Sequence, residues 1–424
     1  MTAVDDSSLQ TAATCPVVGA EPLPPEFFNE PGRDPHSWAK AVREGCPVHK
    51  INHPPGAEAY VVADYATVLK AFTDPRLSKR LDTAPDWFQE QLTDASPVLI
   101  RNMITADPPD HTRLRKLVTK AFAPRKMELL RPRIRQITDE LIDEFPASGE
   151  IDLMTFAYAL PMRVISEFLQ VPDEDRPQVQ ADVVMLSEAP YPDEERNRLL
   201  RVASDKIEQY LLDLLATRRL NLGEDLVSEL IRAADDGEVF TEDELVSTLV
   251  LLIIAGHKTT ANLIGNGTQA LLQQPDQLQL LMNDPSLAEG AVEEFLRLNS
   301  PVFRGTLRIA TEDMELGGVH IPKQSFVHLL MSAANRDPEA FENPERLDIT
   351  RTPNKHVAFG HGAHFCAGAP LSRVEGSIAF PTMLRRLEGL RLAVAPDELE
   401  WIFDNSTSRG LRTLPVRYDK RLPR

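Results

Sequence analysis

Apolar and polar residues recur along most of the chain with the period of amphipathic helices. A first strong helix is expected to open at Asp107-Pro108-Pro109, with Asp107 as its N-cap and proline in its first turn, and to end before Pro124. The Ala-Pro-Tyr-Pro sequence at 189–192 breaks the pattern and predicts a loop. Further helical segments are predicted at 126–145, 155–170, 173–187, 193–219 and 224–234.

The most apolar helix is predicted from Thr241 to about Gln273, where Pro275 ends the pattern. Its middle is hydrophobic on every side, which is typical of a helix buried in a large core. We interpret the pair Gly265 and Gly267 as positions of close helix packing.

Short apolar segments between turns predict a few strands, and helical patterning returns after Cys366. The chain contains no internal repeat and no linker that would separate domains. We therefore expect a mainly α protein with a small β region. A disordered tail is expected over 1–20 and a single domain over 21–424. The predicted strands lie at 59–62, 308–310 and 319–322.

Composition limits the possible partners and the cellular location. The 424 residues carry a net charge of −18, which argues against nucleic acid as a partner. The longest apolar stretch, 249–256, is much shorter than the run of about 18 residues that a transmembrane helix needs, so no membrane is expected. The N-terminal segment has no signal-peptide core. Three cysteines, Cys15, Cys46 and Cys366, cannot form a disulfide framework and suit a reducing cytosol, so we expect a cytoplasmic protein.

One region departs from the acidic balance of the chain and carries a run of basic residues. Such a run is usually a solvated helical face. The alternative is a local basic patch that meets an acidic partner or the acidic groups of a cofactor. The residues are Arg113, Arg115, Lys116, Lys120, Arg125, Lys126, Arg131, Arg133 and Arg135.

The segment Phe359-Gly360-His361-Gly362-Ala363-His364-Phe365-Cys366-Ala367-Gly368 places a cysteine in a glycine-rich turn before a helical stretch. The positive helix end and nearby backbone N–H groups are expected to lower the pKa of this thiol and make it a metal ligand. A lone cysteine is more often a small buried hydrophobe. A zinc or non-haem site built from His356, His361, His364 and Cys366 is a second possibility. A single thiolate to haem iron needs only one protein ligand and fits the pattern better.

The segment resembles the haem-binding loop of the cytochrome P450 family, Phe-Gly-x-Gly-x-His-x-Cys-x-Gly, and matches all six defining positions. The resemblance implies the cytochrome P450 fold, with haem b held between the long central helix and the cysteine loop. It implies that Cys366 is the metal ligand and that His364 is a haem propionate partner. Phe359, Gly360 and Ala255 would then lie beside the haem.

The resemblance is closest to soluble bacterial members that tailor secondary metabolites such as macrolides and other polyketides. It implies a haem-thiolate monooxygenase, a hydroxylase or epoxidase, that acts on a bulky hydrophobic molecule in antibiotic-type biosynthesis. No flavin or nicotinamide domain is appended, so electrons are expected from a separate ferredoxin and ferredoxin reductase. We expect a monomer.

The central helix contains Ala255-Gly256-His257-Lys258-Thr259-Thr260. Thr259 can bond back to the Ala255 carbonyl and bend the helix, which can be a matter of packing alone. The segment also resembles the oxygen-binding motif of the family, Ala/Gly-Gly-x-Asp/Glu-Thr, which implies that Thr259 hydrogen-bonds the bound oxygen. Lys258 replaces the usual acid. It either donates protons itself, points away to pair with an acid, or leaves a slower relay of water and Thr259. A peroxide-driven or otherwise atypical haem-thiolate enzyme therefore remains an alternative, as does a haem sensor without turnover.

Two further patterns gain meaning from the resemblance. Glu294 and Arg297 lie one helical turn apart, which alone indicates only a surface pair. The family places such a pair in a structural triad, and Arg346 would be its third member. His111 and Arg115 share one helix face. The family uses this pattern, together with Arg308, to bind the haem propionates, because Arg and His offer charged donors to carboxylates.

The substrate is expected above the haem, near 82–103, 189–192, the helix around Ala255, and 302–306. Apolar residues in these segments could line a pocket, although such residues are more often ordinary packing. No Gly-x-Ser-x-Gly, His-Glu-x-x-His or phosphate-binding Gly-Lys motif occurs, so hydrolase and NTPase functions are disfavoured. The predicted pocket residues are Trp87, Phe88, Leu99, Ile100, Met103, Val302 and Phe303.

Overall fold

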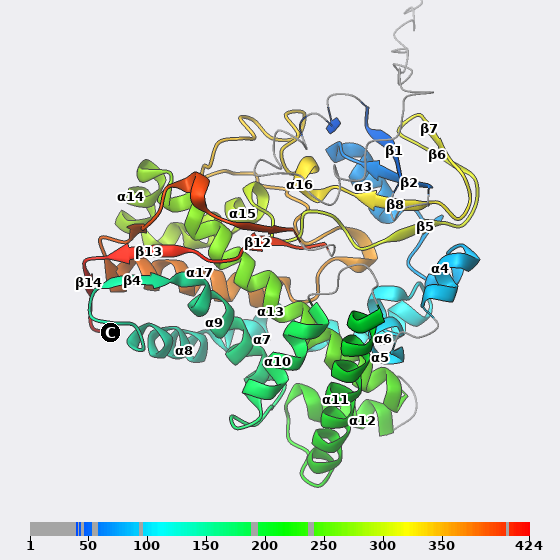
Figure 1. Ribbon diagram of the computed structural model, residues 1–424, viewed down its shortest axis with the longest axis horizontal. Coiled ribbons are helices and arrows are strands. Elements are labelled where there is room, and N and C mark those ends of the chain that lie inside the picture. Colours follow the sequence, from blue (N-terminus) through cyan, green and yellow to red (C-terminus); the bar gives the residue numbers. More distant parts are fainter. Residues whose placement is uncertain are drawn as a thin grey trace, which may run out of the picture.

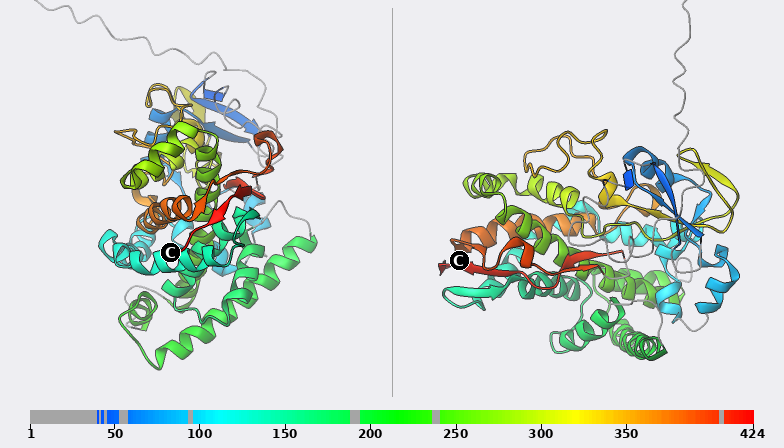
Figure 2. Two further views of the ribbon diagram at one scale, coloured as in Figure 1. Left: turned by 90° about the vertical axis from the view of Figure 1, so that its left-hand side faces the viewer. Right: turned by 45° about the horizontal axis from the view of Figure 1, so that its top comes forward.

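The computed structural model describes residues 40, 42–43, 46–52, 58–92, 96–187, 194–235, 241–403 and 407–424. The tail expected over 1–20 and the loop expected at 189–192 lie outside the described residues. The fold is mainly α with small sheets, as predicted. The long helix α13 (Glu242–Leu272) crosses the middle of the molecule, with the larger sheet above it and helices α8 to α12 below it (Figure 1). Two further views show the same division (Figure 2).

Helices α6 to α12 and α17 occupy segments that the sequence predicts as helical, whereas α3, α4, α5, α14 and α16 were not predicted. The remaining helices have the following bounds. They are α3 (Tyr65–Thr73), α4 (Asp86–Gln91), α5 (Pro97–Ile100), α6 (Asp110–Ala121), α7 (Pro124–Glu128), α8 (Arg131–Asp143), α9 (Leu153–Phe168), α10 (Arg176–Ser187), α11 (Glu194–Arg219), α12 (Leu226–Asp235), α14 (Pro275–Asn283), α15 (Ala288–Leu298), α16 (Met331–Ala334) and α17 (Ala369–Arg386), with short 3₁₀ turns η1 (Leu81–Thr83), η2 (Met103–Thr105), η3 (Pro285–Leu287), η4 (Gly362–His364) and η5 (Pro396–Glu398).

The largest sheet has the strand order β1-β2-β8-β5-β3, in which β2 and β8 are parallel and the other neighbours antiparallel. The smaller sheets are β10-β13-β4, β11-β12, β14-β9 and β6-β7. The strands are β1 (Val48–Asn52), β2 (Glu58–Val62), β3 (Leu77–Ser78), β4 (Gly149–Asp152), β5 (Arg308–Ala310), β6 (Met314–Leu316), β7 (Val319–Ile321), β8 (Phe326–Leu329), β9 (Leu387–Glu388), β10 (Arg391–Leu392), β11 (Trp401–Phe403), β12 (Arg409–Leu411), β13 (Pro415–Tyr418) and β14 (Lys420–Arg421).

Two details of the predicted helices are wrong. Residues 126–145 form two helices, α7 and α8, because Pro132 has no N–H for the carbonyl of Glu128 and therefore starts a new helix in its first turn. Asp107 does not cap α6. Its carboxylate instead accepts hydrogen bonds from the Ser78 hydroxyl at 2.5 Å and from the Lys79 backbone N–H at 3.0 Å. Pro109 occupies the N-cap position of α6.

The central helix α13 begins with a capping box. The Thr241 side chain accepts from the Glu244 backbone N–H, and the Glu244 carboxylate accepts from the Thr241 backbone N–H. The predicted close packing at its glycines is confirmed. A Cβ at Gly265 would lie 2.5 Å from Met154 Sδ, and one at Gly267 would lie 2.7 Å from the Phe380 ring. These contacts let α9 and α17 approach the helix backbone directly.

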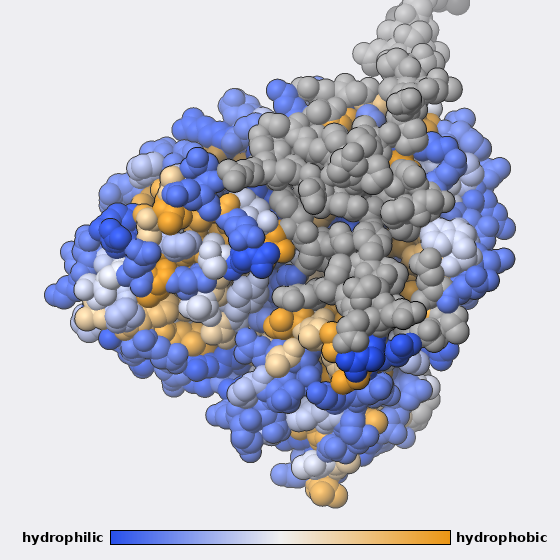
Figure 3. All heavy atoms as spheres, viewed as in Figure 1, coloured by the Kyte–Doolittle hydropathy of each residue, from blue (hydrophilic) through white to orange (hydrophobic). Residues whose placement is uncertain are grey.

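By length and composition, α13 could cross a membrane, with a mean hydropathy of 1.3 over its most apolar window. However, 67% of that window is buried inside the protein, and a core helix passes the same test. Hydrophilic side chains cover most of the coloured surface in Figure 3. The apolar character of α13 is therefore explained by the core that it occupies.

Candidate haem site

The segment from Phe359 to Gly368 forms a tight loop that leads into α17. Gly360 and Gly362 both have a φ of +73°, a conformation that favours glycine. A Cβ at Gly362 would lie 3.0 Å from Thr73 Cγ2, so the loop also needs glycine to pack against α3. The Cys366 N–H donates to the Phe359 carbonyl at 2.8 Å, which closes the loop. This geometry holds the cysteine just before the helix, as predicted.

Accessible residues occur both in the loop and in the middle of α13. Cys366 is a free, accessible cysteine, and the neighbouring Phe365 is 38% exposed. Ala255 is exposed in the middle of the otherwise buried helix α13. The two elements are close together here, because Thr260 Oγ1 of α13 lies 3.5 Å from Ser372 Oγ of α17. A thiol, glycines and an alanine in this arrangement fit a flat cofactor between loop and helix.

The sequence predicts a lowered pKa for the Cys366 thiol, and this prediction is wrong for the protein without a bound metal ion. Although Cys366 is accessible, the protein atoms packed around its sulfur desolvate the thiolate and raise the pKa of the thiol. The backbone N–H groups of Gly368 and Ala369 and the guanidinium groups of Arg115 and Arg373 oppose this effect without overcoming it. Because a bound cation deprotonates a coordinating thiol, a metal ion at this position would supply the missing stabilisation of the thiolate.

Beside the loop, several buried cationic groups gather with little negative charge to balance them. Burial lowers the pKa of Arg308 to about 10, and burial together with the nearby Lys79 lowers the pKa of His364 to about 2. Burial and Arg115 lower the pKa of His111, whose ring lies 4.0 Å from that of His364. His111 Nε2 is buried with no hydrogen-bond partner among the described residues. An anionic ligand would balance these buried positive charges, and the two carboxylates of the haem propionates have the required charge.

The structure places Arg115 next to the loop itself. Its Nη2 donates to the Phe365 carbonyl, and its Nε donates to Thr119 Oγ1 at 3.2 Å. The Cys366 sulfur also acts on the pKa of Arg115, which burial lowers. Arg115 therefore supports the backbone that carries the cysteine, in addition to the propionate contact that the resemblance implies.

Lys79 belongs to the same cationic cluster, and no sequence motif marks it. It is 4% exposed, and its ammonium group donates to Thr306 Oγ1. Burial and the neighbouring Arg308 lower its pKa well below the ordinary value, and only Asp107 raises it. Only the packing of β3 against β5 brings Lys79 beside Arg308, since 229 positions separate them in the chain (308 − 79).

We expect that Lys79→Met makes the protein lose haem faster by about 10- to 100-fold, because a hydrogen bond to a charged group contributes roughly 1.5–3 kcal/mol. The haem-free protein should become no less stable, since the substitution removes a buried cation. Haem transfer to apomyoglobin and thermal unfolding of the haem-free protein measure the two effects. Lys116→Met, on the exposed side of α6, is the control. An unchanged rate of haem loss would show that Lys79 has no part in holding the cofactor.

On α13 the predicted back-bond of Thr259 is confirmed, since its hydroxyl donates to the Ala255 carbonyl at 2.7 Å. The helix nevertheless continues unbroken from Glu242 to Leu272. Lys258 is half-buried. The hydroxyl of Thr259 thus lies on the same accessible stretch of the helix as Ala255.

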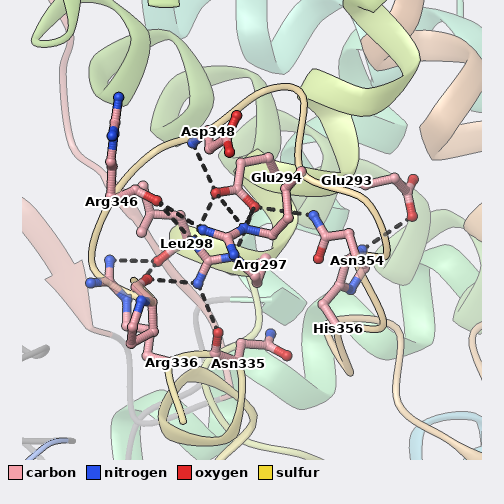
Figure 4. Close-up of polar contacts among 12 residues, drawn as sticks. Glu293, Glu294, Arg297, Leu298, Asn335, Arg336, Arg346, Asp348, Asn354 and His356 are labelled. Atoms are coloured by element: carbon pink, nitrogen blue, oxygen red, sulfur yellow. Dashed lines mark hydrogen bonds and ion pairs between the residues drawn. The ribbon is translucent and has the colours of Figure 1, made fainter. Parts of the chain in front are cut away.

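The pair Glu294 and Arg297 is fully buried rather than a surface pair (Figure 4). Arg297 Nε and Nη2 donate to the two carboxylate oxygens of Glu294 at 2.7 and 2.8 Å. The prediction that Arg346 is the third member of the triad with Glu294 and Arg297 is wrong. Arg346 contributes only its backbone carbonyl, 3.2 Å from Arg297, whereas Arg351 Nε donates to both oxygens of Glu294. The turn around Asp348 directs the side chain of Arg351, not that of Arg346, toward Glu294.

The neighbouring Glu293 anchors the cysteine loop. Its carboxylate pairs with Arg373 at 2.7 Å and with His356 at 3.2 Å, and these partners lower its pKa to about 2 despite burial. Arg373 in turn lies over the Phe359 ring at 4.7 Å. His356 is thus engaged with Glu293, and the described residues contain no cluster of three or more His, Cys, Asp or Glu that could hold a metal ion. The zinc alternative has no support in these contacts.

The predicted pocket residues do not form one lining. Trp87 and Phe88 pack edge-on against Phe326, in a cluster that also contains Phe303. Leu99 and Met103 belong to the main core, and Val302 to a third cluster. Ile100 lines a hollow of about 810 Å³ between 80–114, α11 and the start of α13.

Comparison with known proteins explains these features together. The family model "Cytochrome P450" matches residues 175–415, more than half of the chain. The chain belongs to the cytochrome P450 family. This P450 is 42% identical to cytochrome P450 monooxygenase PikC of Streptomyces venezuelae, over 96% of each chain. It is 40% identical to the polyketide biosynthesis cytochrome P450 PksS of Bacillus subtilis, over 91% of this chain and 96% of PksS.

A solved structure is similarly close. CxnD, a cytochrome P450 for C–S bond formation in chuangxinmycin biosynthesis, is 50% identical, and its structure matches with a TM-score of 0.91 over 95% of this chain and 99% of CxnD. As a P450 monooxygenase, the protein binds haem b. The cationic cluster, the accessible thiol and the small residues on α13 all fit that cofactor.

Proposed function

We propose that this P450 inserts one oxygen atom of O2 into a C–H or C=C bond of a bulky hydrophobic molecule of the macrolide or polyketide type. The balanced reaction for a C–H bond is RH + O2 + 2 H⁺ + 2 e⁻ giving ROH + H2O. The observation that carries the proposal is a free, accessible Cys366 in a loop with two left-handed glycines, directly before α17, which packs against α13. The names of PikC and PksS support monooxygenation and a polyketide substrate class.

We assign the roles in the haem site as follows. Cys366 would ligate the haem iron, and a thiolate-ligated haem would supply the activation of O2. His364, His111, Arg115 and Arg308 bind the propionates as charged donors. The remaining residues act by shape and by hydrogen bonding. Phe359, Gly360 and Ala255 border the ring, and Thr259 offers its hydroxyl to the oxygen side of the site.

The test of this proposal is product formation by the purified, haem-loaded protein with a ferredoxin, its reductase and ¹⁸O2. We expect one ¹⁸O atom in the product when a panel of macrolides and polyketides is screened. A ferrous carbon monoxide complex without the red-shifted Soret band of a thiolate ligand would contradict the assignment of Cys366. A correct spectrum with ligand binding but no product under any electron supply would favour the haem sensor.

We further propose that an acidic ferredoxin delivers electrons by docking at the basic surface of α6 and α7. We also propose that the enzyme is a monomer and works in the cytoplasm. Lys116, Lys120, Arg125 and Lys126 are exposed on these helices, and Glu229 of α12 pairs with Lys120 at 3.6 Å and with Lys126 at 3.2 Å. Arg113 is less exposed and pairs with Glu244 at 2.6 Å, so we leave it out of this surface.

Lys116→Glu is expected to slow reduction by the ferredoxin by about tenfold at low salt, with the difference vanishing at high salt, where charges are screened. Stopped-flow reduction under carbon monoxide measures the rate. Lys420→Glu on β14, at the opposite end of the molecule from α6 (Figure 1), is the matched control. Equal effects of both substitutions would indicate a general charge effect and no docking at α6.

The replacement of the usual acid by Lys258 leaves the source of protons open. If Lys258 limits proton delivery, Lys258→Glu should raise the product formed per electron by about tenfold. Lys258→Met serves as the control for loss of the ammonium group. Unchanged turnover and coupling in Lys258→Glu would refute a special role of this residue, and turnover supported only by peroxide would favour the peroxide-driven alternative.

A further inference from the structure

A hollow of about 720 Å³ lies between α8, α14 and α17, and none of its lining residues belongs to the haem site described above. The three helices lie at the end of the molecule that holds the C-terminus (Figure 1). A helix rises 1.5 Å per residue, so Thr382 in the wall of the hollow is roughly 20 Å from the start of α17, where the cysteine loop ends. Small-molecule pockets have volumes of about 300–1,000 Å³. The hollow is therefore large enough for a ligand of its own.

The hollow is lined by three arginines and one glutamate, although the chain as a whole has a net charge of −18. Arg131 has its donors engaged within the wall. Its Nε and Nη2 donate to the Glu128 carboxylate at 2.8 and 2.9 Å, and its Nη1 donates to Ser377 Oγ at 3.0 Å. Glu289, the glutamate of the wall, also pairs with Arg131, at 3.6 Å. The negative charges near the hollow are thus directed to Arg131.

The other two arginines keep most of their donors available. Arg135, one turn after Arg131 on α8, is exposed and makes no hydrogen bond or ion pair with any described residue. Arg385 on α17 is also exposed and lies 3.7 Å from Asp139, whose carboxylate already accepts from Arg386 at 2.6 Å. Two guanidinium groups from different helices therefore border one hollow without a carboxylate of their own.

Thr382 is a second, independent indication of a ligand. It lines the hollow and is 2% exposed, and its Oγ1 has no hydrogen-bond partner among the described residues. Buried polar atoms are nearly always hydrogen-bonded, so a hydroxyl without a partner in the wall of a hollow indicates that a ligand completes it. Leu281, Met282 and Leu384 also line the hollow. The wall thus combines cations and a hydroxyl with apolar surface.

We propose that this hollow binds a phosphate monoester carried on a small apolar body. A phosphate monoester has a charge of about −2 at neutral pH and balances both Arg135 and Arg385, whereas a carboxylate balances only one of them. Arginine also matches the geometry of phosphate oxygens with two parallel N–H donors. The Thr382 hydroxyl donates to a further oxygen. The apolar side chains contact the rest of the ligand. Binding is reversible and does not depend on the proposed monooxygenase reaction.

Isothermal titration calorimetry of the haem-loaded protein tests the site, with a haem-ligating azole present so that the probes cannot occupy the substrate site. The probes are hexyl phosphate, inorganic phosphate, hexanoate and hexanol. We expect hexyl phosphate to bind at one site. Inorganic phosphate should bind at least about tenfold more weakly, since each buried CH2 group adds roughly fourfold in affinity. Hexanoate should also be about tenfold weaker, because it leaves one guanidinium unpaired. Hexanol should not bind.

Substitutions in the wall locate the binding. Arg135→Ala and Arg385→Ala should each weaken hexyl phosphate binding by about 10- to 100-fold, as expected for loss of a hydrogen bond to a charged group. Thr382→Val should weaken it by about fivefold. Arg417→Ala is the matched control, because Arg417 is an exposed arginine of β13 that pairs with Glu150 outside the hollow, and it should bind hexyl phosphate as the wild-type protein does.

Three results would overturn the proposal. The first is that hexyl phosphate does not bind to the wild-type protein, or binds equally well to Arg135→Ala and Arg385→Ala. The second is that inorganic phosphate binds as tightly as hexyl phosphate, which would exclude the apolar body and leave a site for the free ion. The third is that both substitutions slow reduction by the ferredoxin without changing hexyl phosphate binding, which would make the hollow part of the ferredoxin surface. Because the titrations involve no turnover, failure of the monooxygenase proposal would leave them unaffected.

Discussion

Cys366→Ser is expected to abolish turnover and to remove the red-shifted Soret band of the ferrous carbon monoxide complex. The thiol is the free, accessible cysteine at the end of the glycine-rich loop, and burial keeps its pKa high unless a cation binds. A serine hydroxyl is a far weaker ligand, because it stays protonated where a thiol ionises. We therefore expect a fall in turnover of more than about 10³-fold, comparable to the loss of other essential catalytic groups.

Cys366→His separates loss of the cofactor from loss of thiolate donation. A histidine is also a common haem ligand, so this variant should retain haem and show the Soret band of a nitrogen-ligated haem, yet remain inactive. The absorbance spectrum and the haem content per chain provide the readout. Residual activity of Cys366→Ser near the wild-type level would mean that another residue ligates the iron.

Arg297→Ala is expected to yield little folded protein and almost no bound haem. Arg297 and Glu294 are both fully buried, and among the described residues the substitution leaves this core carboxylate with Arg351 as its one cation partner. Breaking a buried pair in this way costs about 3–5 kcal/mol, a large part of the roughly 5–15 kcal/mol that stabilises a typical domain. Arg297 also binds the carbonyls of Asn335 and Pro344, so the segment between them would lose its anchor.

Two arginines near this pair provide graded controls. Arg351→Ala removes a partner of Glu294 and should lower stability by less than Arg297→Ala. Arg346→Ala should have a small effect, because only the backbone carbonyl of Arg346 contacts Arg297. Haem content and denaturant unfolding measure all three variants. Equal losses in Arg346→Ala and Arg351→Ala would contradict the triad seen in the structure.

Features that depend on residues close together in the sequence were predictable from the sequence. The period of apolar residues marked α13 within a residue at each end, and the glycine spacing marked the turn that holds Cys366. The basic residue types of the propionate cluster were predictable only through the family resemblance. Lys79 was missed because its burial arises from the pairing of β3 with β5, which no local pattern announces.

The errors have the same origin. Arg346 and Arg351 lie in one irregular segment, and only its path through space decides which side chain reaches Glu294. The pKa of Cys366 was misjudged because the helix end was considered without the cost of burial. Cys46 is disulfide-bonded, whereas the three cysteines were expected to suit a reducing cytosol.

Adjacent carboxylates on α15 hold two different parts of the chain. Glu293 binds Arg373 and His356 on either side of the cysteine loop, and Glu294 binds Arg297, Arg351 and Asn354. Any rotation of α15 that freed one carboxylate would displace the other. The region around the haem thiolate should therefore melt as one cooperative unit, with amide hydrogens of the loop and of 346–354 exchanging with solvent together rather than in sequence.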